Sequence, residues 1–177
     1  MALSHAILVT LLDGPISGYK LTKRFNAAIG YFWQATHQQI YRELTSLEKH
    51  GSVQRVPSSS SSTEKLYTLT QEGRNALTEW ISQPSEPGVV REDLLLKVRA
   101  GSLVPREVLL TELRRRRVLS AERLAIYREA EAREYPDAQH LSYEQRLRYL
   151  PLLRGLMFEQ ENVAWCDAAI ALLQEGM

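Results

Sequence analysis

The sequence has little of what several classes of protein require. Its 177 residues include one cysteine, Cys166, so no internal disulfide can form; we expect a packed thiol there, with a redox switch as the alternative. The four histidines are scattered without the spacing of a zinc site, and we expect no metal and no other cofactor. No run of about 18 apolar residues occurs, so we expect no membrane span. Because the first residues also lack a signal-peptide pattern, we expect a cytoplasmic protein.

Charge of one sign is not in excess either, since the formal net charge is +1. A protein that coats nucleic acid without selectivity would be strongly basic. The charge is nevertheless separated along the chain, because residues 17–42 contain no acidic residue and four basic ones: Lys20, Lys23, Arg24 and Arg42. This separation favours a protein that holds phosphate in one place, as a site-specific DNA-binding protein does.

Motifs for catalysis are lacking as well. The sequence shows no paired carboxylates, no nucleophile with a base and no glycine-rich phosphate loop at a usable spacing. We therefore expect no catalytic residues and no enzyme activity.

What is present is a well-delimited helix at residues 37–49. Thr36 and Gln39 have the spacing of a capping box, and Gly51 follows where helices commonly end. Apolar residues recur at helical spacing and predict one buried face: Ile40, Leu44 and Leu47. The other face is hydrogen-bonding and mostly uncharged: His37, Gln38, Tyr41, Arg42, Thr45 and Lys49. Such a face suits base edges in a DNA major groove, although an ordinary amphipathic helix would show it too.

Two helices are expected before this one. Ser4 is placed to cap the first, whose apolar stripe is Ile7, Leu8, Leu11 and Leu12. Ser17 is placed to cap the second, whose expected buried face is Leu21, Phe25, Ala28 and Ile29. The outer face of the second carries Tyr19, Lys20, Lys23 and Arg24. Trp33 lies in the connection that follows, where it either completes the core or meets a ligand. This arrangement predicts a helix-turn-helix.

A β-hairpin is expected directly after the third helix. Residues 52–56 and 65–69 are short and extended in pattern, and Pro57 with five serines separates them. Placed after a helix-turn-helix, this hairpin would be a wing that lies along DNA. Thr70 then caps a fourth helix, whose expected inner face is Ala76, Leu77, Trp80 and Ile81.

The second half of the chain has helical patterns throughout. Residues 83–91 hold two prolines and a glycine and are the expected linker. A short helix at 92–100 and a long one from Pro105 to Glu134 follow, before Pro136 ends the pattern. Four successive arginines, residues 114–117, lie in the long helix; they either form ion pairs with neighbouring carboxylates or contact DNA. The expected partners are Glu107, Glu112 and Glu122.

The last helical region begins at a second capping box, Ser142 with Gln145. Pro151 predicts a kink or a new helix start. From residue 152 onward, apolar residues occupy more of the surface than one covered side requires, so we expect a second copy of the chain to bury the rest. The expected dimerisation residues are Leu153, Met157, Ala164, Trp165, Ala168 and Leu172.

The predicted fold class is therefore mainly α, in two domains. Residues 1–82 form an N-terminal winged helix-turn-helix with a small β-hairpin wing, and residues 83–91 are the linker. Residues 92–177 form a C-terminal α-helical dimerisation domain.

Several motifs in this order resemble the PadR family of bacterial transcriptional regulators. They are DGPISGYKL at 13–21, HQQIYRELTSLEKHG at 37–51, KLYTLTQEGR at 65–74 and the aromatic Trp33. The segments DLLLKVRAG at 93–101 and NVAWCDAAIALL at 162–173 resemble the family's helical dimerisation domain more loosely. The wing departs from the pattern, because a serine run stands where many members carry glycine, proline and arginine.

This resemblance implies a winged-helix repressor that binds a two-fold operator as a homodimer. A small molecule, often phenolic or hydrophobic, or another signal would release it. The sequence holds no ligand-binding motif, and the candidate ligand contacts are Trp33 and Trp165.

Within such a regulator the residue types divide into two roles on double-stranded DNA. We expect base contacts from His37, Gln38 and Arg42. We expect backbone contacts from Tyr19, Lys20, Lys23, Tyr41, Arg55 and Lys65. The alternative is a winged-helix protein-interaction module that binds no DNA, which the near-neutral charge and the weakly basic wing would suit.

Overall fold

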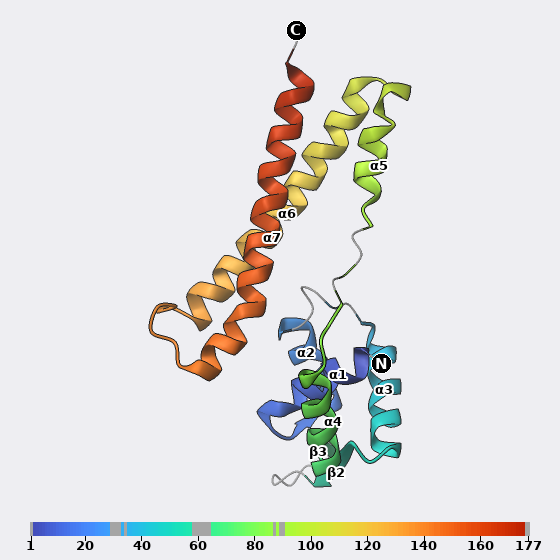
Figure 1. Ribbon diagram of the computed structural model, residues 1–177, viewed down its shortest axis with the longest axis vertical. Coiled ribbons are helices and arrows are strands. Elements are labelled where there is room, and N and C mark those ends of the chain that lie inside the picture. Colours follow the sequence, from blue (N-terminus) through green and yellow to red (C-terminus); the bar gives the residue numbers. More distant parts are fainter. Residues whose placement is uncertain are drawn as a thin grey trace. The chain divides into compact units, whose positions relative to one another are not determined.

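The computed structural model describes residues 2–28, 33, 35–57, 65–86, 88 and 91–175. The chain divides into two compact units, Met1–Pro87 and Gly88–Met177, which we describe separately. Figure 1 shows the first unit as a group of short helices around a small sheet and the second as long helices. In the described part of the chain, every helix is too short or too polar to cross a bilayer.

The first unit begins with three helices. Helix α1 spans Ala2–Thr10 and continues into the short 3-10 helix η1, Leu11–Asp13. After a turn at Gly14 (φ 110°), helix α2 spans Gly18–Ala28. Helix α3 spans His37–Lys49, and helix α4, Gln71–Ser82, follows the sheet.

The sheet has three antiparallel strands in the order β1-β3-β2. Strands β2 (Val53–Pro57) and β3 (Lys65–Leu69) form the predicted hairpin, with Arg55 opposite Tyr67 and Pro57 opposite Lys65. The sequence analysis missed β1 (Ile16–Ser17), which pairs with Tyr67 and Leu66. Two residues are too few to show a strand period, so only the pairing identifies them. The serine-rich tip lies outside the described residues.

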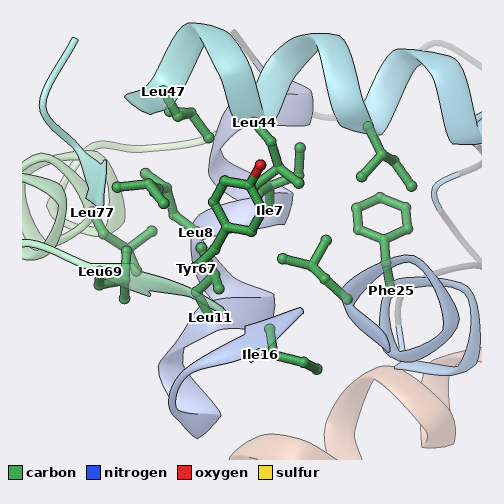
Figure 2. Close-up of a cluster of buried hydrophobic side chains, with 13 residues drawn as sticks. Ile7, Leu8, Leu11, Ile16, Phe25, Leu44, Leu47, Tyr67, Leu69 and Leu77 are labelled. Atoms are coloured by element: carbon green, nitrogen blue, oxygen red, sulfur yellow. The ribbon is translucent and has the colours of Figure 1, made fainter. Parts of the chain in front are cut away.

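One apolar core holds the first unit together, and Figure 2 shows side chains from all its elements meeting there. Ile7, Leu21, Phe25, Ile40 and Leu44 are fully buried. The Tyr67 ring extends from β3 toward α3 and is also buried. Since this core includes the apolar faces of α2 and α3, it sets which faces of these two helices remain exposed.

Some expectations for the first unit were wrong. Helix α1 begins at Ala2, so Ser4 lies within it and does not cap it. Leu12 is 48% exposed, because the 3-10 turn at residues 11–13 changes the helical period on which its burial was predicted. Only Leu77 of the expected inner face of α4 is buried, whereas Ala76 is exposed and Trp80 and Ile81 are 45% and 65% exposed. Ile29 and the Ala28 side chain lie outside the described set.

Trp80 contacts helix α1 instead of entering the core. Its indole stacks on the His5 ring of α1, with the ring centroids 4.5 Å apart and the planes at 11°. Periodicity shows which residues share a helix face, but not whether another element covers that face. Apart from this stacking on His5, Trp80 and Ile81 remain 45% and 65% exposed.

The second unit is helical. Helix α5 spans Asp93–Arg99, the 3-10 helix η2 spans Gly101–Leu103, and α6 spans Arg106–Glu134. Helix α7, Tyr143–Gln174, packs along α6 (Figure 1) and begins at the predicted capping box of Ser142 with Gln145. It continues through Pro151, so the prediction of a new helix start there was wrong.

Residues 114–117 confirm the prediction of an ion-paired surface. Each arginine has its own carboxylate: Arg114 with Glu107 (3.9 Å), Arg115 with Glu112 (2.7 Å), Arg116 with Glu92 (2.6 Å) and Arg117 with Asp167 (2.5 Å). The expected partner Glu122 does not take part in these pairs. Two partners lie outside α6, so the arginines connect α6 to the residue before α5 and to α7. Each of these arginines therefore already has an ion-pair partner within the second unit.

Candidate nucleic-acid interface

Helix α3 begins at a complete capping box. The Thr36 hydroxyl accepts a hydrogen bond from the Gln39 backbone N–H (3.2 Å), and the Thr36 N–H donates to Gln39 Oε1 (2.8 Å). These bonds satisfy two of the amides that a helix N-terminus leaves free. The first turn is therefore well defined, with His37 and Gln38 held in place by the backbone.

Helix α3 ends at Gly51, which has a φ of 75°. The Ser52 N–H donates to Leu47 O (3.0 Å) and the Gly51 N–H donates to Glu48 O (3.1 Å), so these two carbonyls of the last turn are satisfied. Glycine suits this left-handed conformation because it lacks a Cβ. Strand β2 then begins at Val53, which places the hairpin directly after α3.

The two faces of α3 differ as predicted. Ile40, Leu44 and Leu47 lie in the core, at 0%, 0% and 7% exposure. The following polar residues of α3 are exposed: His37, Gln38, Gln39, Arg42, Thr45 and Lys49. The first unit therefore leaves a face of hydrogen-bonding side chains on α3 exposed, of which Gln39 also accepts a bond from the Thr36 N–H and Thr45 donates one to the Tyr41 carbonyl.

Tyr41 joins α3 to α2. Its ring stacks on the His37 ring, with centroids 4.4 Å apart and planes at 28°. A Cβ built on Gly18, the first residue of α2, would lie 2.7 Å from the Tyr41 hydroxyl. Tyr41 is half-buried in this contact, so it connects the first turn of α3 to the start of α2.

The outer face of α2 carries exposed cationic groups. Ser17 Oγ accepts a hydrogen bond from the Lys20 N–H (3.4 Å) and caps the helix as predicted. Lys23 Nζ lies 4.8 Å from the centroid of the Tyr19 ring, which is 57% exposed. Lys20 and Lys23 are exposed as well. Arg24 differs from them, since its Nη1 lies 3.9 Å from Asp13 and the carboxylate partly neutralises it.

The two basic residues of the wing are not equivalent. Lys65, at the start of β3, is exposed. Arg55 Nη2 lies 2.7 Å from Glu48 Oε2, and its guanidinium carbon lies 5.3 Å from the centroid of the Tyr67 ring. The sequence analysis missed Glu48 as a member of this site, because the contact joins a helix to a strand.

The structure thus groups the DNA candidates on three neighbouring elements of the first unit. His37, Gln38 and Arg42 lie on the exposed face of α3; Tyr19, Lys20 and Lys23 lie on α2; and Arg55 and Lys65 lie on the wing. Arg and Gln side chains can each make paired hydrogen bonds with base edges, whereas lysines act as point charges toward phosphate.

The remaining candidates lie elsewhere. Trp33 is half-buried and packs on the core of the first unit. On α7, Leu153 is half-buried, whereas Met157, Ala164, Trp165, Ala168 and Leu172 are exposed. Across the described ranges of the chain, no three His, Cys, Asp or Glu side chains gather as a metal site would require.

Comparison with known proteins agrees with this geometry. The model of the transcriptional regulator PadR-like family matches residues 7–79, and a model described as the virulence activator alpha C-terminal region matches residues 90–174. A probable transcriptional regulator of Mycobacterium tuberculosis is 34% identical, over 99% of this chain and 99% of that protein.

Solved structures share the fold over nearly the whole chain. The Vibrio cholerae virulence activator AphA is 38% identical, with a TM-score of 0.81 and 97% of each chain covered. Bacillus subtilis PadR in complex with operator DNA is 27% identical, with a TM-score of 0.84 and 97% of each chain covered. The same protein in complex with p-coumaric acid is 28% identical, with a TM-score of 0.82, covering 99% of this chain and 100% of that one. The negative transcriptional regulator PadR of Bacillus subtilis is 30% identical, over 98% of this chain and 98% of that protein, and the chain therefore belongs to the PadR-like family of transcriptional regulators.

Proposed function

We propose that this chain represses transcription by binding a two-fold operator as a homodimer. The observation that carries the proposal is the exposed polar face of α3, held by a buried apolar face and flanked by the cationic outer face of α2. The likeness to Bacillus subtilis PadR, which was solved in complex with operator DNA, supports operator binding by this chain.

Base reading and backbone anchoring are proposed for different residues. The base-reading set is His37, Gln38 and Arg42, in the first turns of α3, which are the turns that enter the major groove in helix-turn-helix proteins. The backbone-contact set is Tyr19, Lys20, Lys23, Tyr41, Arg55 and Lys65. Tyr41 would support the DNA-backbone contacts mainly through its position between α2 and α3.

We propose that residues 1–82 form the DNA-binding domain, 83–91 the linker and 92–177 the dimerisation domain. Apolar side chains that are exposed on α7, including Met157 (60%), Trp165 (37%) and Leu172 (68%), support a second copy as the partner. A dimer would place two α3 helices about 34 Å apart, the spacing of successive major grooves on one side of the duplex.

A small phenolic or hydrophobic effector would release the DNA. The complex of PadR with p-coumaric acid supports this chemistry for the relative. Trp165 remains a candidate contact, whereas the packing of Trp33 on the core supports a structural role for that residue. We further propose that the protein works in the cytoplasm and has no enzymatic activity.

The direct test is a mobility shift and a footprint on the DNA upstream of the protein's own gene, at about 0.1 M salt. We expect a specific complex over a two-fold site and its release by phenolic compounds. A protein-interaction module would give no specific complex. A reporter gene under this site then measures the sign of regulation; increased expression would contradict repression and would match the activity named for AphA.

A further inference from the structure

On the wing, the positive charge of Arg55 already has a partner within the first unit. Its ion pair with Glu48 (2.7 Å) joins β2 to the last turn of α3. Its guanidinium also lies against the Tyr67 ring, which is buried and directly opposite Arg55 in the strand register. Two contacts on different elements therefore hold the guanidinium beside the recognition helix.

Stability does not account for Glu48. A carboxylate in the last turn of a helix faces the negative end of the helix dipole, which disfavours it. The side chains of Arg55 and Glu48 are 37% and 31% exposed, and pairs with this exposure contribute little to stability. A negative charge on the helix that faces DNA also repels phosphate. Both the helix and general DNA affinity would gain from a neutral residue here.

The pair has a large effect on the charge of the wing. Between residues 52 and 69 the only basic residues are Arg55 and Lys65. Neutralising Arg55 therefore removes half of the positive charge that the wing could offer to phosphate. When any duplex approaches, its phosphates must compete with Glu48 for this guanidinium.

We propose that Glu48 is a specificity-determining residue that keeps Arg55 from phosphate on random DNA. On the operator, the base contacts of α3 hold the duplex in one register, so that a phosphate stays beside Arg55 and replaces Glu48. On random DNA no register is maintained, and Arg55 remains paired with Glu48. This inference rests on the proposed DNA-binding function and adds a residue that lowers random binding more than operator binding.

The test uses the full-length protein and two fluorescent duplexes, one with the footprinted site and one with the same site scrambled. Binding is measured by anisotropy over a series of NaCl concentrations. The variants are Glu48→Gln, Arg55→Gln and the double variant. Glu43→Gln, made alone and together with Arg55→Gln, is the matched control, because it removes a carboxylate from the same helix. Thermal melting verifies that each variant folds, and Glu48→Ala replaces Glu48→Gln if the latter does not.

We expect Glu48→Gln to tighten binding to the scrambled duplex several-fold and to steepen its salt slope by about 0.9, the value for one added phosphate contact. Operator binding should tighten less, so the ratio of the two affinities falls. In the Arg55→Gln background the same substitution should leave the salt slope unchanged. Glu43→Gln should change the slope equally with and without Arg55.

Three results would overturn the inference. They are an unchanged slope for Glu48→Gln, a steepening that persists without Arg55, and an equal gain on both duplexes, which indicates general repulsion. If the wild-type protein leaves no footprint, or does not prefer the footprinted site over the scrambled one at any salt concentration, the proposed function itself fails. Failure of the function is thus distinguished from failure of the role of Glu48.

Discussion

The hydroxyl of Tyr41 occupies the space where a side chain on Gly18 would begin. A Cβ on Gly18 would lie 2.7 Å from this oxygen and 2.9 Å from the ring carbon that carries it. Because Gly18 starts α2 and Tyr41 lies in α3, this contact sets how closely these two helices approach each other. Only glycine fits at this position without movement of the ring.

Gly18→Ala should displace Tyr41 and lower both stability and operator affinity. Overpacking of this kind costs about 1 to 3 kcal/mol in the free energy of unfolding. Urea denaturation followed by circular dichroism measures the first effect, and anisotropy with operator DNA measures the second. Gly88→Ala is the control, because a Cβ there meets nothing within 4 Å. Equal behaviour of the two variants would disprove the packing role.

Phosphate and base contacts should separate by salt dependence. Lys23→Ala should weaken operator and random DNA alike and reduce the salt slope by about 0.9, because one fewer counterion is released. Gln38→Ala and Arg42→Ala should each lower the free-energy preference for the correct base at one base pair of the operator, by about 1 to 3 kcal/mol. Competition titrations at several salt concentrations measure both quantities. If Gln38→Ala reduces random binding as much as Lys23→Ala does, the division of roles is wrong.

The exposed apolar face of α7 should tolerate no charge if it is the dimer interface. Met157→Glu would bury an unpaired carboxylate between subunits, and we expect the dimer to dissociate while the helical content stays unchanged. Sedimentation velocity measures the mass, and circular dichroism measures the helix. Gln139→Glu, at an exposed position before α7, adds the same charge and should leave the dimer intact. A Met157→Glu protein that stays dimeric would place the interface elsewhere.

Cys166 should behave as an inert packed thiol. It is 3% exposed, and burial raises its pKa above the ordinary value, so the reactive thiolate is scarcer at a given pH than in a free thiol. We expect slow reaction with a disulfide reagent at about pH 8 and fast reaction in urea. Absorbance of the released thiolate follows both rates. A native thiol as reactive as free cysteine would favour a redox switch.

Features that depend on neighbouring residues could be predicted from the sequence. Both capping boxes, at Thr36 and Ser142, need side chains only three residues apart, and both are present. The buried face of α3 follows in the same way from helical spacing. The predicted positions of the polar residues on α3 are therefore reliable because their causes are local.

Features that depend on distant residues could not be predicted. The strand at Ile16 exists only through its pairing with Tyr67, and Arg55 meets Glu48 only because β2 turns back along α3. The exposure of Trp80 likewise depends on what covers α4. Sequence period identifies the residues of a face, whereas long-range packing decides what that face contacts.

The pairing of β1 with β3 has a mechanical consequence for regulation. Ser17 belongs to β1 and also caps α2, so the returning strand of the wing is connected directly to the helix that supports α3. Bending the wing would strain α2, and shifting α2 would strain Tyr41. We therefore expect the sheet, α2 and α3 to move together as one rigid unit. Some substitutions should abolish release of DNA by an effector and leave DNA affinity unchanged. We expect them outside the first unit, in the linker or in the helices that join the two copies.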